Sequence, residues 1–128
     1  MEEAQAAPEV VLGTFPVNSI PATVLLDSSA THSFTSKRFV GVHGFRKVEL
    51  STPMKVNTPG NSSTSVSFCP SMRIEIQGSP FLAYLILLEC KDLDVILGMD
   101  WLIRHKAVID CASGGNSVSI NSEERSKF

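Results

Sequence analysis

The sequence predicts one all-β domain, and three observations support this prediction. Short apolar runs recur along the chain, and clusters of Gly, Pro, Asn and Ser separate them, as is typical of strands and turns. A helix of any length is indicated only for residues 98–105, which have the end signals of a helix. The 128 residues, 43% of them hydrophobic, are enough for one packed core and too few for two.

The first strands form a hairpin. Residues 10–17 and 22–27 are β-rich runs on either side of Asn18-Ser19, a hairpin turn signal. Residues 33–40 then read as a connector with a helical turn or two at most, for which Ser36 is the candidate cap.

A second hairpin follows, and unlike the first it is expected to bury few side chains. Residues 47–56 and 64–68 flank a Pro-Gly turn within 57–61. Serines fill the outer half of this hairpin and cannot supply a core. We therefore expect an exposed, mobile hairpin that would suit a lid.

The second half of the chain completes the sheet. Residues 72–77 alternate, 81–88 are continuously apolar, and 94–97 form a strand that ends in glycine. The short helix at 98–105 has an acid in its first turn and basic residues in its last, which complement the helix dipole. Final strands are expected at 108–109 and 118–120, around a Gly-rich turn at 113–116.

The domain is expected to span residues 9–120, between a polar linker at 1–8 and a polar tail at 121–128. The net charge of −2, without a Lys/Arg cluster, argues against binding to nucleic acid or to an acidic membrane surface. The longest apolar run is far shorter than the roughly 20 residues of a membrane helix, and the chain begins without a basic segment. We expect a soluble, cytoplasmic protein.

The cysteines and histidines show no ligand spacing. Cys69, Cys90 and Cys111 are widely separated and odd in number, which fits reduced core thiols in a reducing compartment better than disulfides or a zinc site. The three histidines, His32, His43 and His105, are equally scattered, so we expect no metal.

One carboxylate stands at the end of a buried strand. The apolar run 24–26 ends in Asp27, where burying a charge is costly unless the charge serves a purpose. An acid–base catalyst needs such a placement. The alternative is an Asx-type turn after a strand, without catalysis. Val95-Ile96-Leu97-Gly98 echoes the pattern of Val24-Leu25-Leu26-Asp27, with glycine in place of the acid.

Three stretches together resemble a known family: LDSSATHSF at 26–34, DVILGMDWL at 94–102 and HKAVIDC at 105–111. They resemble the protease domain of gypsy-type LTR retrotransposon polyproteins, a branch of the retropepsin, or retroviral-type aspartyl protease, family. The resemblance covers roughly residues 10–120, nearly the whole chain.

The resemblance implies a small, closed, mostly antiparallel acid-protease β-barrel with one short C-terminal helix, active as a two-fold homodimer in polyprotein self-processing. It implies one catalytic aspartate per chain, Asp27, and an extended polypeptide substrate beneath two flap hairpins, with no cofactor. The implied active-site loop is Ser28, Ser29, Ala30 and Thr31, the flap tip is Thr58, Pro59 and Gly60, and the hydrophobic-hydrophobic-glycine motif is Ile96, Leu97 and Gly98. The Ser28 hydroxyl would brace the two loops across the axis.

The chemistry explains why two chains are needed. Two carboxylates near 3 Å cannot both ionise, so one stays protonated while the other acts as the base. One chain supplies one such aspartate, and a two-fold axis between two copies of Asp27 builds the pair from a single sequence. We expect Asp94, Asp100 and Asp110 to be solvated and not catalytic. Thr31, His32 and Trp101 are expected to serve loop hydrogen bonding and core packing.

One position departs from the family pattern, in which Gly follows Asp-Ser or Asp-Thr. Ser29 adds a Cβ and a hydroxyl that could crowd the carboxylates, add a hydrogen bond, or be absorbed by a small loop shift. The sequence therefore leaves two hypotheses open: an aspartic endopeptidase, or a catalytically silent module that dimerises or binds peptides.

Overall fold

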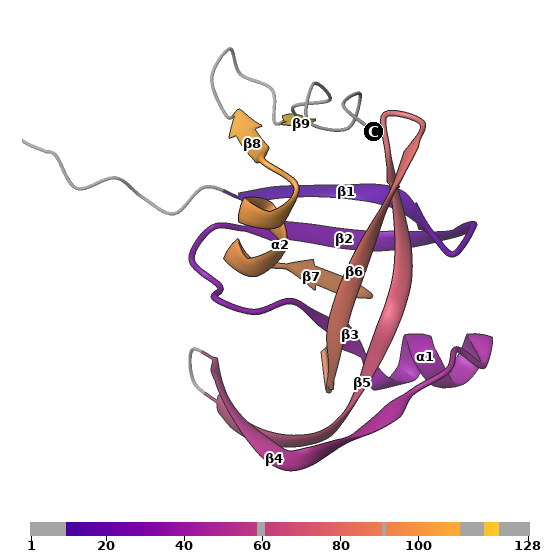
Figure 1. Ribbon diagram of the computed structural model, residues 1–128, viewed down its shortest axis with the longest axis vertical. Helices are drawn as coiled ribbons and strands as arrows, with labels where there is room; N and C mark the ends of the chain where they lie inside the picture. The colour runs from indigo at the N-terminus through magenta and orange to yellow at the C-terminus, as the bar shows by residue number, and fades with distance from the viewer. Residues whose placement is uncertain (1–9, 59–60, 91, 111–116, 121–128) are drawn as a thin grey trace, which may run out of the picture.

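Nine strands and two short helices make up the described part of the chain. The structure is a computed structural model, and it describes residues 10–58, 61–90, 92–110 and 117–120 (Figure 1). The elements are β1 (Val10–Val17), β2 (Ile20–Asp27), β3 (Phe34–Ser36), α1 (Lys37–His43), β4 (Val48–Thr58), β5 (Asn61–Ile76), β6 (Ser79–Leu88), β7 (Val95–Leu97), α2 (Met99–Arg104), β8 (Ala107–Asp110) and β9 (Ser117–Ile120).

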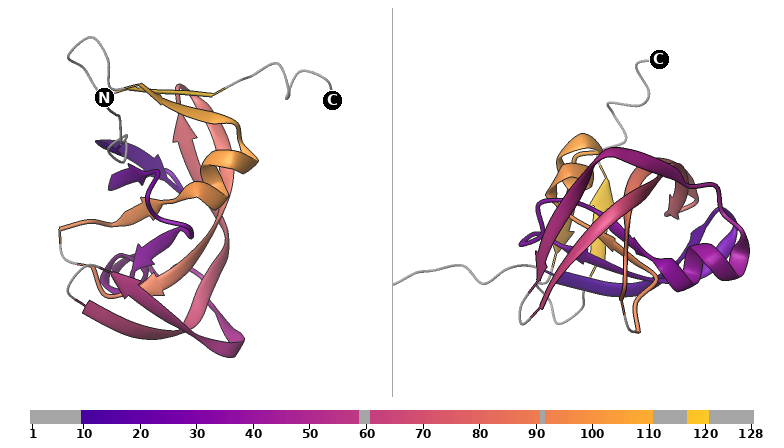
Figure 2. Two further views of the ribbon diagram at one scale, coloured as in Figure 1. Left: turned by 90° about the vertical axis from the view of Figure 1, so that its left-hand side faces the viewer. Right: turned by 90° about the horizontal axis from the view of Figure 1, so that it is seen from below.

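Within the described residues, six of the strands close into a barrel. The sheet order is β1-β2-β7-β3-β6-β5, and β5 pairs back to β1 where Val17 meets Ile74. β4 hydrogen-bonds to β5 outside this ring, and β8 and β9 form a separate two-stranded sheet. Figure 2 shows from below how the β4–β5 ribbon lies across the end of the barrel. The predicted closed, mostly-β fold is confirmed.

The first hairpin turns as predicted at Asn18 and Ser19. Both residues have positive φ, 51° and 70°, which matches the two-residue turn that suits the twist of a hairpin. Asn18 also hydrogen-bonds to β5. Its side-chain oxygen accepts from the backbone amide of Arg73 at 2.8 Å, and its backbone amide donates to the backbone carbonyl of Arg73 at 2.8 Å. The turn therefore helps to close the barrel.

The two echoing segments of the sequence are partners in space. β2 and β7 run parallel, in a register that pairs Val24 with Val95 and Leu26 with Leu97. Because parallel strands end at the same edge of a sheet, Asp27 and Gly98 leave the sheet side by side. β3 and β6 form a second parallel pair, so the barrel is not antiparallel throughout.

The core lies inside the barrel and under α2. Leu26, Ile74, Leu85 and Leu97 are completely buried there, and Trp101 of α2 packs against the same cluster. Fully burying each such side chain contributes about 1.5–3 kcal/mol. A smaller cluster lies beneath β4 and consists of Phe34, Val56, Ile86 and Leu88, with Met54 and Ile96 packed against it.

The segment predicted as a connector with a helical turn or two contains a strand and a short helix. Phe34–Ser36 form β3, which was not predicted, and α1 follows for seven residues, which is about two helical turns. The predicted cap is confirmed, since the Ser36 hydroxyl accepts from the Phe39 amide at 3.0 Å. Gly44 ends the helix at φ 66°, a left-handed conformation that glycine adopts without strain. Neither helix is long and apolar enough to cross a membrane, as far as the described residues extend.

Two strands predicted separately, 64–68 and 72–77, are one long strand in the structure. β5 continues through Pro70 by means of a shift in register between Cys69 and Met72. A proline cannot donate to the ladder, and such an irregularity absorbs it. The predicted hairpin is present, with Thr58 paired to Asn61, while the flap-tip candidates Pro59 and Gly60 lie outside the described residues.

The remaining strands and the C-terminal helix follow the prediction closely. β6, β7 and α2 occupy the predicted segments, and β8 pairs with β9 from Ala107 opposite Ile120 to Asp110 opposite Ser117. The proposed linker 1–8, the tail 121–128 and the turn at 113–116 lie outside the described residues.

Candidate active site

Asp27 is the last residue of β2 and is half-buried at the edge of the barrel. Its Oδ1 atom accepts two hydrogen bonds from Ser29, one from the amide at 2.9 Å and one from the hydroxyl at 2.6 Å. The Ala30 amide donates to the Asp27 carbonyl at 3.2 Å. The Asx-type turn considered from the sequence is therefore present, and it holds the carboxylate in one orientation. Such a turn is compatible with catalysis.

The extra hydroxyl of Ser29 is accommodated as a hydrogen-bond donor. Ser29 is exposed, so its Cβ is not forced into the barrel wall. A carboxylate oxygen accepts about two hydrogen bonds, and Ser29 alone fills that capacity at Oδ1. Oδ2 is the Asp27 oxygen that remains for a shared proton or a water.

The Asp27 loop is held by the start of α2. The Gly98 amide donates to the Ser33 hydroxyl at 2.9 Å, and the Met99 amide donates to the Ala30 carbonyl at 2.7 Å. A Cβ built on Gly98 would lie 2.7 Å from the Ala30 carbonyl oxygen and closer still to that of His32. At φ −100°, Gly98 has ordinary backbone geometry, so glycine is required here by space alone. The structure thus packs the end of Ile96-Leu97-Gly98 directly against the Asp27 loop.

A second clamp on the loop was not predicted. The Ser33 hydroxyl, which is buried, donates to Asp100 Oδ1 at 2.6 Å, and the Trp101 amide donates to the same oxygen at 2.7 Å. Asp100 is exposed, as expected of a solvated carboxylate, and its Oδ1 in addition accepts these two bonds. An acid in the first turn of a helix often accepts hydrogen bonds, and this was the signal available in the sequence.

Asp94, which was likewise expected to be solvated, also accepts a structural hydrogen bond. This side chain is half-buried, and its Oδ2 accepts from the Thr23 amide at 2.9 Å, which extends the contact between β2 and β7. A carboxylate just before a strand can satisfy an amide of the neighbouring strand in this way. The side chain of Asp110 lies outside the described residues.

A cleft of about 570 Å³ opens over Asp27. Its lining comes from the Asp27 loop, from β3 and β7, and from the middle of β4: Asp27, Ser29, Ala30, Thr31, His32, Phe34, Met54, Lys55, Val56 and Ile96. In Figure 1 the loop that follows β2 and the far end of the β4–β5 hairpin lie on the same side of the molecule. Sequence reasoning did not select the β4 residues, although Met54 and Val56 alternate with polar neighbours as wall residues do.

An apolar groove of about 520 Å³ lies on the other side of the same loop. Ser28 forms one part of its lining, and the rest comes from the end of α2 and from β8: Met99, Leu102, Ile103, Lys106, Ala107, Val108 and Ile109. Ile103 and Val108 are 66% and 61% exposed, which is high for aliphatic side chains. The loop therefore borders both hollows: Asp27 and Ser29 line the cleft, and Ser28 lines the apolar groove.

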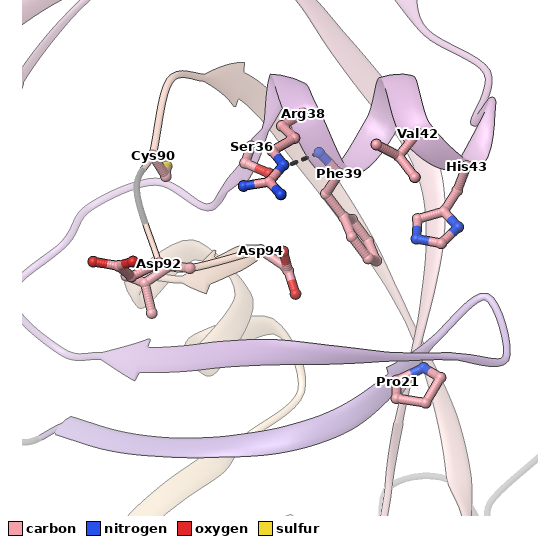
Figure 3. Close-up of a pocket in the computed structure, with 10 residues that line it drawn as sticks. Pro21, Ser36, Arg38, Phe39, Val42, His43, Cys90, Asp92 and Asp94 are labelled. Carbon is pink, nitrogen blue, oxygen red and sulfur yellow. Dashed lines mark hydrogen bonds between the residues drawn. The ribbon is translucent and has the colours of Figure 1, made fainter.

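A third pocket, of about 340 Å³, is remote from this loop. It lies between α1 and the segment that leads into β7, and its lining includes Arg38 and Phe39 from the first and Asp92 and Asp94 from the second (Figure 3). Its lining contains no residue of the Asp27 loop. We assign the candidate active site to the cleft that contains Asp27.

The other residues singled out from the sequence serve packing and loop structure. Trp101 is buried beside Phe81, with ring centroids 6.2 Å apart, as expected of a core residue. Thr31 Oγ1 and His32 Nδ1 lie 3.0 Å apart in a hydrogen bond within the loop, also as expected. The described residues contain no group of three or more metal-binding side chains.

The described cysteines, Cys69 and Cys90, carry free thiols, and Cys111 lies outside the described residues. Burial raises the pKa of both thiols, and for Cys69 nearby Lys47 partly offsets this effect. Both thiols therefore stay protonated near neutral pH, which disfavours reaction.

The fold and the site together define a class. A closed β-barrel that presents one aspartate after a strand, in a loop packed against a hydrophobic-hydrophobic-glycine turn, is the retropepsin-like form of the acid-protease fold.

Comparison with known proteins places the chain within that class. It belongs to the retroviral aspartyl protease family, whose family model matches residues 1–126. Among solved structures, it is similar to the retroviral protease-like domain of Ddi1 from Leishmania major, with 21% identity, a TM-score of 0.64, and coverage of 94% of this chain and 89% of that one. It is also similar to the EIAV protease in complex with the inhibitor HBY-793, with 19% identity, a TM-score of 0.56, and coverage of 73% and 86%. A search of curated proteins finds no match.

Proposed function

We propose that the chain is an aspartic endopeptidase that works as a homodimer, with one Asp27 from each copy. The observation that carries the proposal is the Asp27 carboxylate, which is held in one orientation by Ser29 at the edge of a peptide-sized cleft. Membership of the retroviral aspartyl protease family supports the same reaction class.

In the proposed reaction, the two Asp27 carboxyls share one proton across a two-fold axis. The ionised member takes a proton from a water, the water attacks the scissile carbonyl, and the protonated member donates toward the developing oxyanion. Ser29 leaves Oδ2 of each Asp27 available for these proton transfers.

The proposed substrate is an extended polypeptide, such as the polyprotein of a retrotransposon that carries this domain. The cleft offers an apolar wall built from Phe34, Met54, Val56 and Ile96. An extended peptide can meet such a wall with alternate side chains while its main chain bonds to nearby strands.

The apolar groove beside Ser28 supports the proposed dimer. Ile103 and Val108 are exposed next to the loop that must face its copy, so the groove continues the surface that the two-fold axis would cross. Covering exposed aliphatic side chains with the same surface of a second copy removes them from water.

A cleavage assay tests the proposal. The purified chain should cleave an unstructured polypeptide at mildly acidic pH, and pepstatin should stop the cleavage. Because two chains form the site, activity per chain should rise with protein concentration until dimers predominate. A dimer verified by sedimentation that cleaves no peptide would contradict the proposal, as would cleavage that is insensitive to pepstatin.

A substitution in the apolar groove tests the dimer contact in the same assay. Ile103→Glu would place an unpaired charge in the dimer contact, so the concentration needed for half-maximal activity should rise by at least about tenfold. Val42→Glu is the matched control, because Val42 is equally exposed but lies on α1, outside the groove. It should leave the concentration dependence unchanged.

The saturation of Asp27 Oδ1 by Ser29 is the observation that favours the second candidate, a catalytically silent module that dimerises or binds peptides. If the hydroxyl slows the reaction by occupying this oxygen, Ser29→Ala and Ser29→Gly should both cleave faster than the native chain. One hydrogen bond of about 1 kcal/mol corresponds to about fivefold in kcat/KM.

The two substitutions separate the hydroxyl from the Cβ. Since the hydroxyl contacts the carboxylate and the Cβ is exposed, we expect equal gains from both variants, measured with one peptide at saturating dimer concentration. A gain from Ser29→Gly alone would show that the Cβ crowds the site. Slower cleavage by both would show that the hydroxyl assists catalysis.

A further inference from the structure

The cleft over Asp27 combines apolar walls with basic side chains, and we propose that the protein selects peptides that carry an acidic side chain in the segment the cleft covers. This inference rests on the proposed function and narrows its class of substrate. His32 of the loop and Lys55 of β4 would be the specificity-determining residues.

Among the described residues, the charged or titratable side chains that line the cleft are Asp27, His32 and Lys55. The two Asp27 carboxyls that share one proton carry a single negative charge between them, whereas each copy adds a His32 and a Lys55. The basic side chains therefore outnumber the ionised acid. The other walls are mainly apolar, with Phe34 from β3 and Ile96 from β7. The apolar walls can thus contact an apolar side chain of a bound peptide, and the basic side chains can contact a carboxylate of the same peptide.

The His32 ring is arranged to meet a ligand through one nitrogen. Thr31 Oγ1 engages Nδ1 at 3.0 Å, and His32 is exposed. When the imidazole is protonated, both ring nitrogens are donors. Nδ1 can then donate to Thr31, while Nε2 donates to a carboxylate of the peptide. Lys55 is exposed and lines the cleft from β4, so a second cation can reach the same peptide.

Both basic side chains can meet the same acidic residue of a peptide. In the described part of the chain, the charged groups that line the cleft together with His32 are Asp27 from the end of β2 and Lys55 from β4, while β3 and β7 contribute Phe34 and Ile96. A glutamate side chain of the peptide is ionised above about pH 4.3. The preference for such a peptide over an uncharged one should therefore depend on both His32 and Lys55.

The experiment compares two peptides that differ only in Glu or Gln at one position. Binding is measured by fluorescence anisotropy at one mildly acidic pH with the Asp27→Asn chain, so that the result does not depend on cleavage. We expect the Glu peptide to bind about three to ten times more tightly than the Gln peptide, a modest factor because exposed charge pairs are screened by water.

Three further variants identify the side chains that cause the preference for the Glu peptide. In the same Asp27→Asn chain, His32→Gln and Lys55→Gln should each lower the preference for the Glu peptide. His43→Gln, an exposed histidine of α1 outside the cleft, is the control and should bind like its parent.

The possible results separate the inference from the proposed function. Equal binding of both peptides, or a preference that neither His32→Gln nor Lys55→Gln lowers, would overturn the inference. A preference that either substitution lowers supports it even if the native chain cleaves neither peptide, a result that would count against the proposed function alone. Faster cleavage of the Glu peptide by the native chain would support both.

Discussion

Replacing Asp27 by asparagine should lower the rate of peptide cleavage by at least about a thousandfold while the barrel stays folded. An amide cannot act as the base or carry the shared proton. Its oxygen can still accept the amide hydrogen bond from Ser29 that closes the turn, so the loop keeps its shape. Cleavage measured by peptide fluorescence, together with circular dichroism, would report both effects.

Asp94→Asn is the matched control. Asp94 is also a half-buried carboxylate that accepts one backbone amide, but it lies outside the cleft. Because asparagine can still accept from Thr23, cleavage by this variant should stay within a few-fold of the native rate. Equal cleavage by the native chain and by Asp27→Asn would remove Asp27 from the mechanism.

The Asp27→Asn chain also tests whether the site needs two copies. Mixed with a ninefold excess of this variant, a native chain would pair with another native chain about one time in ten, so cleavage should fall about tenfold by mass action. Unchanged cleavage in a mixture that has exchanged subunits would mean that one chain suffices.

Gly98→Ala should have the second large effect, because its Cβ would overlap the carbonyls of Ala30 and His32. Backbone atoms cannot rotate away as a side chain can, so the loop or α2 must move. We expect a loss of about 1–3 kcal/mol in the free energy of unfolding. Cleavage should fall about a hundredfold, because displacement of the Asp27 loop misplaces the carboxylate.

Gly41→Ala is the control for this substitution. Gly41 lies in α1, and nothing lies within 4 Å of the position that its Cβ would take. Alanine favours a helix, so this variant should be as stable as the native chain or up to about 1 kcal/mol more stable, with cleavage unchanged. Thermal melts of both variants measure the difference. A Gly98→Ala chain that melts and cleaves like the native one would show that the loop yields without cost.

The parts of the fold that carry strong local signals were predicted from the sequence. The turn at Asn18-Ser19, the Ser36 cap and the helix at Met99–Arg104 each depend on residues close together in the chain. Asp27 stood out because a charge at the end of a buried strand calls for an explanation. The structure places it in the lining of the cleft.

The parts that depend on distant partners were not predicted. β3 has three residues, too few to show a period, and it is a strand only because Phe34 pairs with both Ile86 and Ile96. The Ser33–Asp100 bond joins residues 67 positions apart. Lys55 likewise lines the cleft only because the β4–β5 hairpin lies across the end of the barrel.

The parallel pairing of β2 with β7 bears on when the Asp27 loop can take its shape during synthesis of the chain. The amide of Gly98 that holds Ser33 lies 65 residues further along the chain, so the ribosome must deliver β7 and α2 before the Asp27 loop can take its final shape. Strand pairs between distant segments also form slowly. A growing chain that has emerged only as far as β6 therefore carries Asp27 in an unfinished loop. Maturation of the site is thereby postponed until nearly the whole domain has been translated.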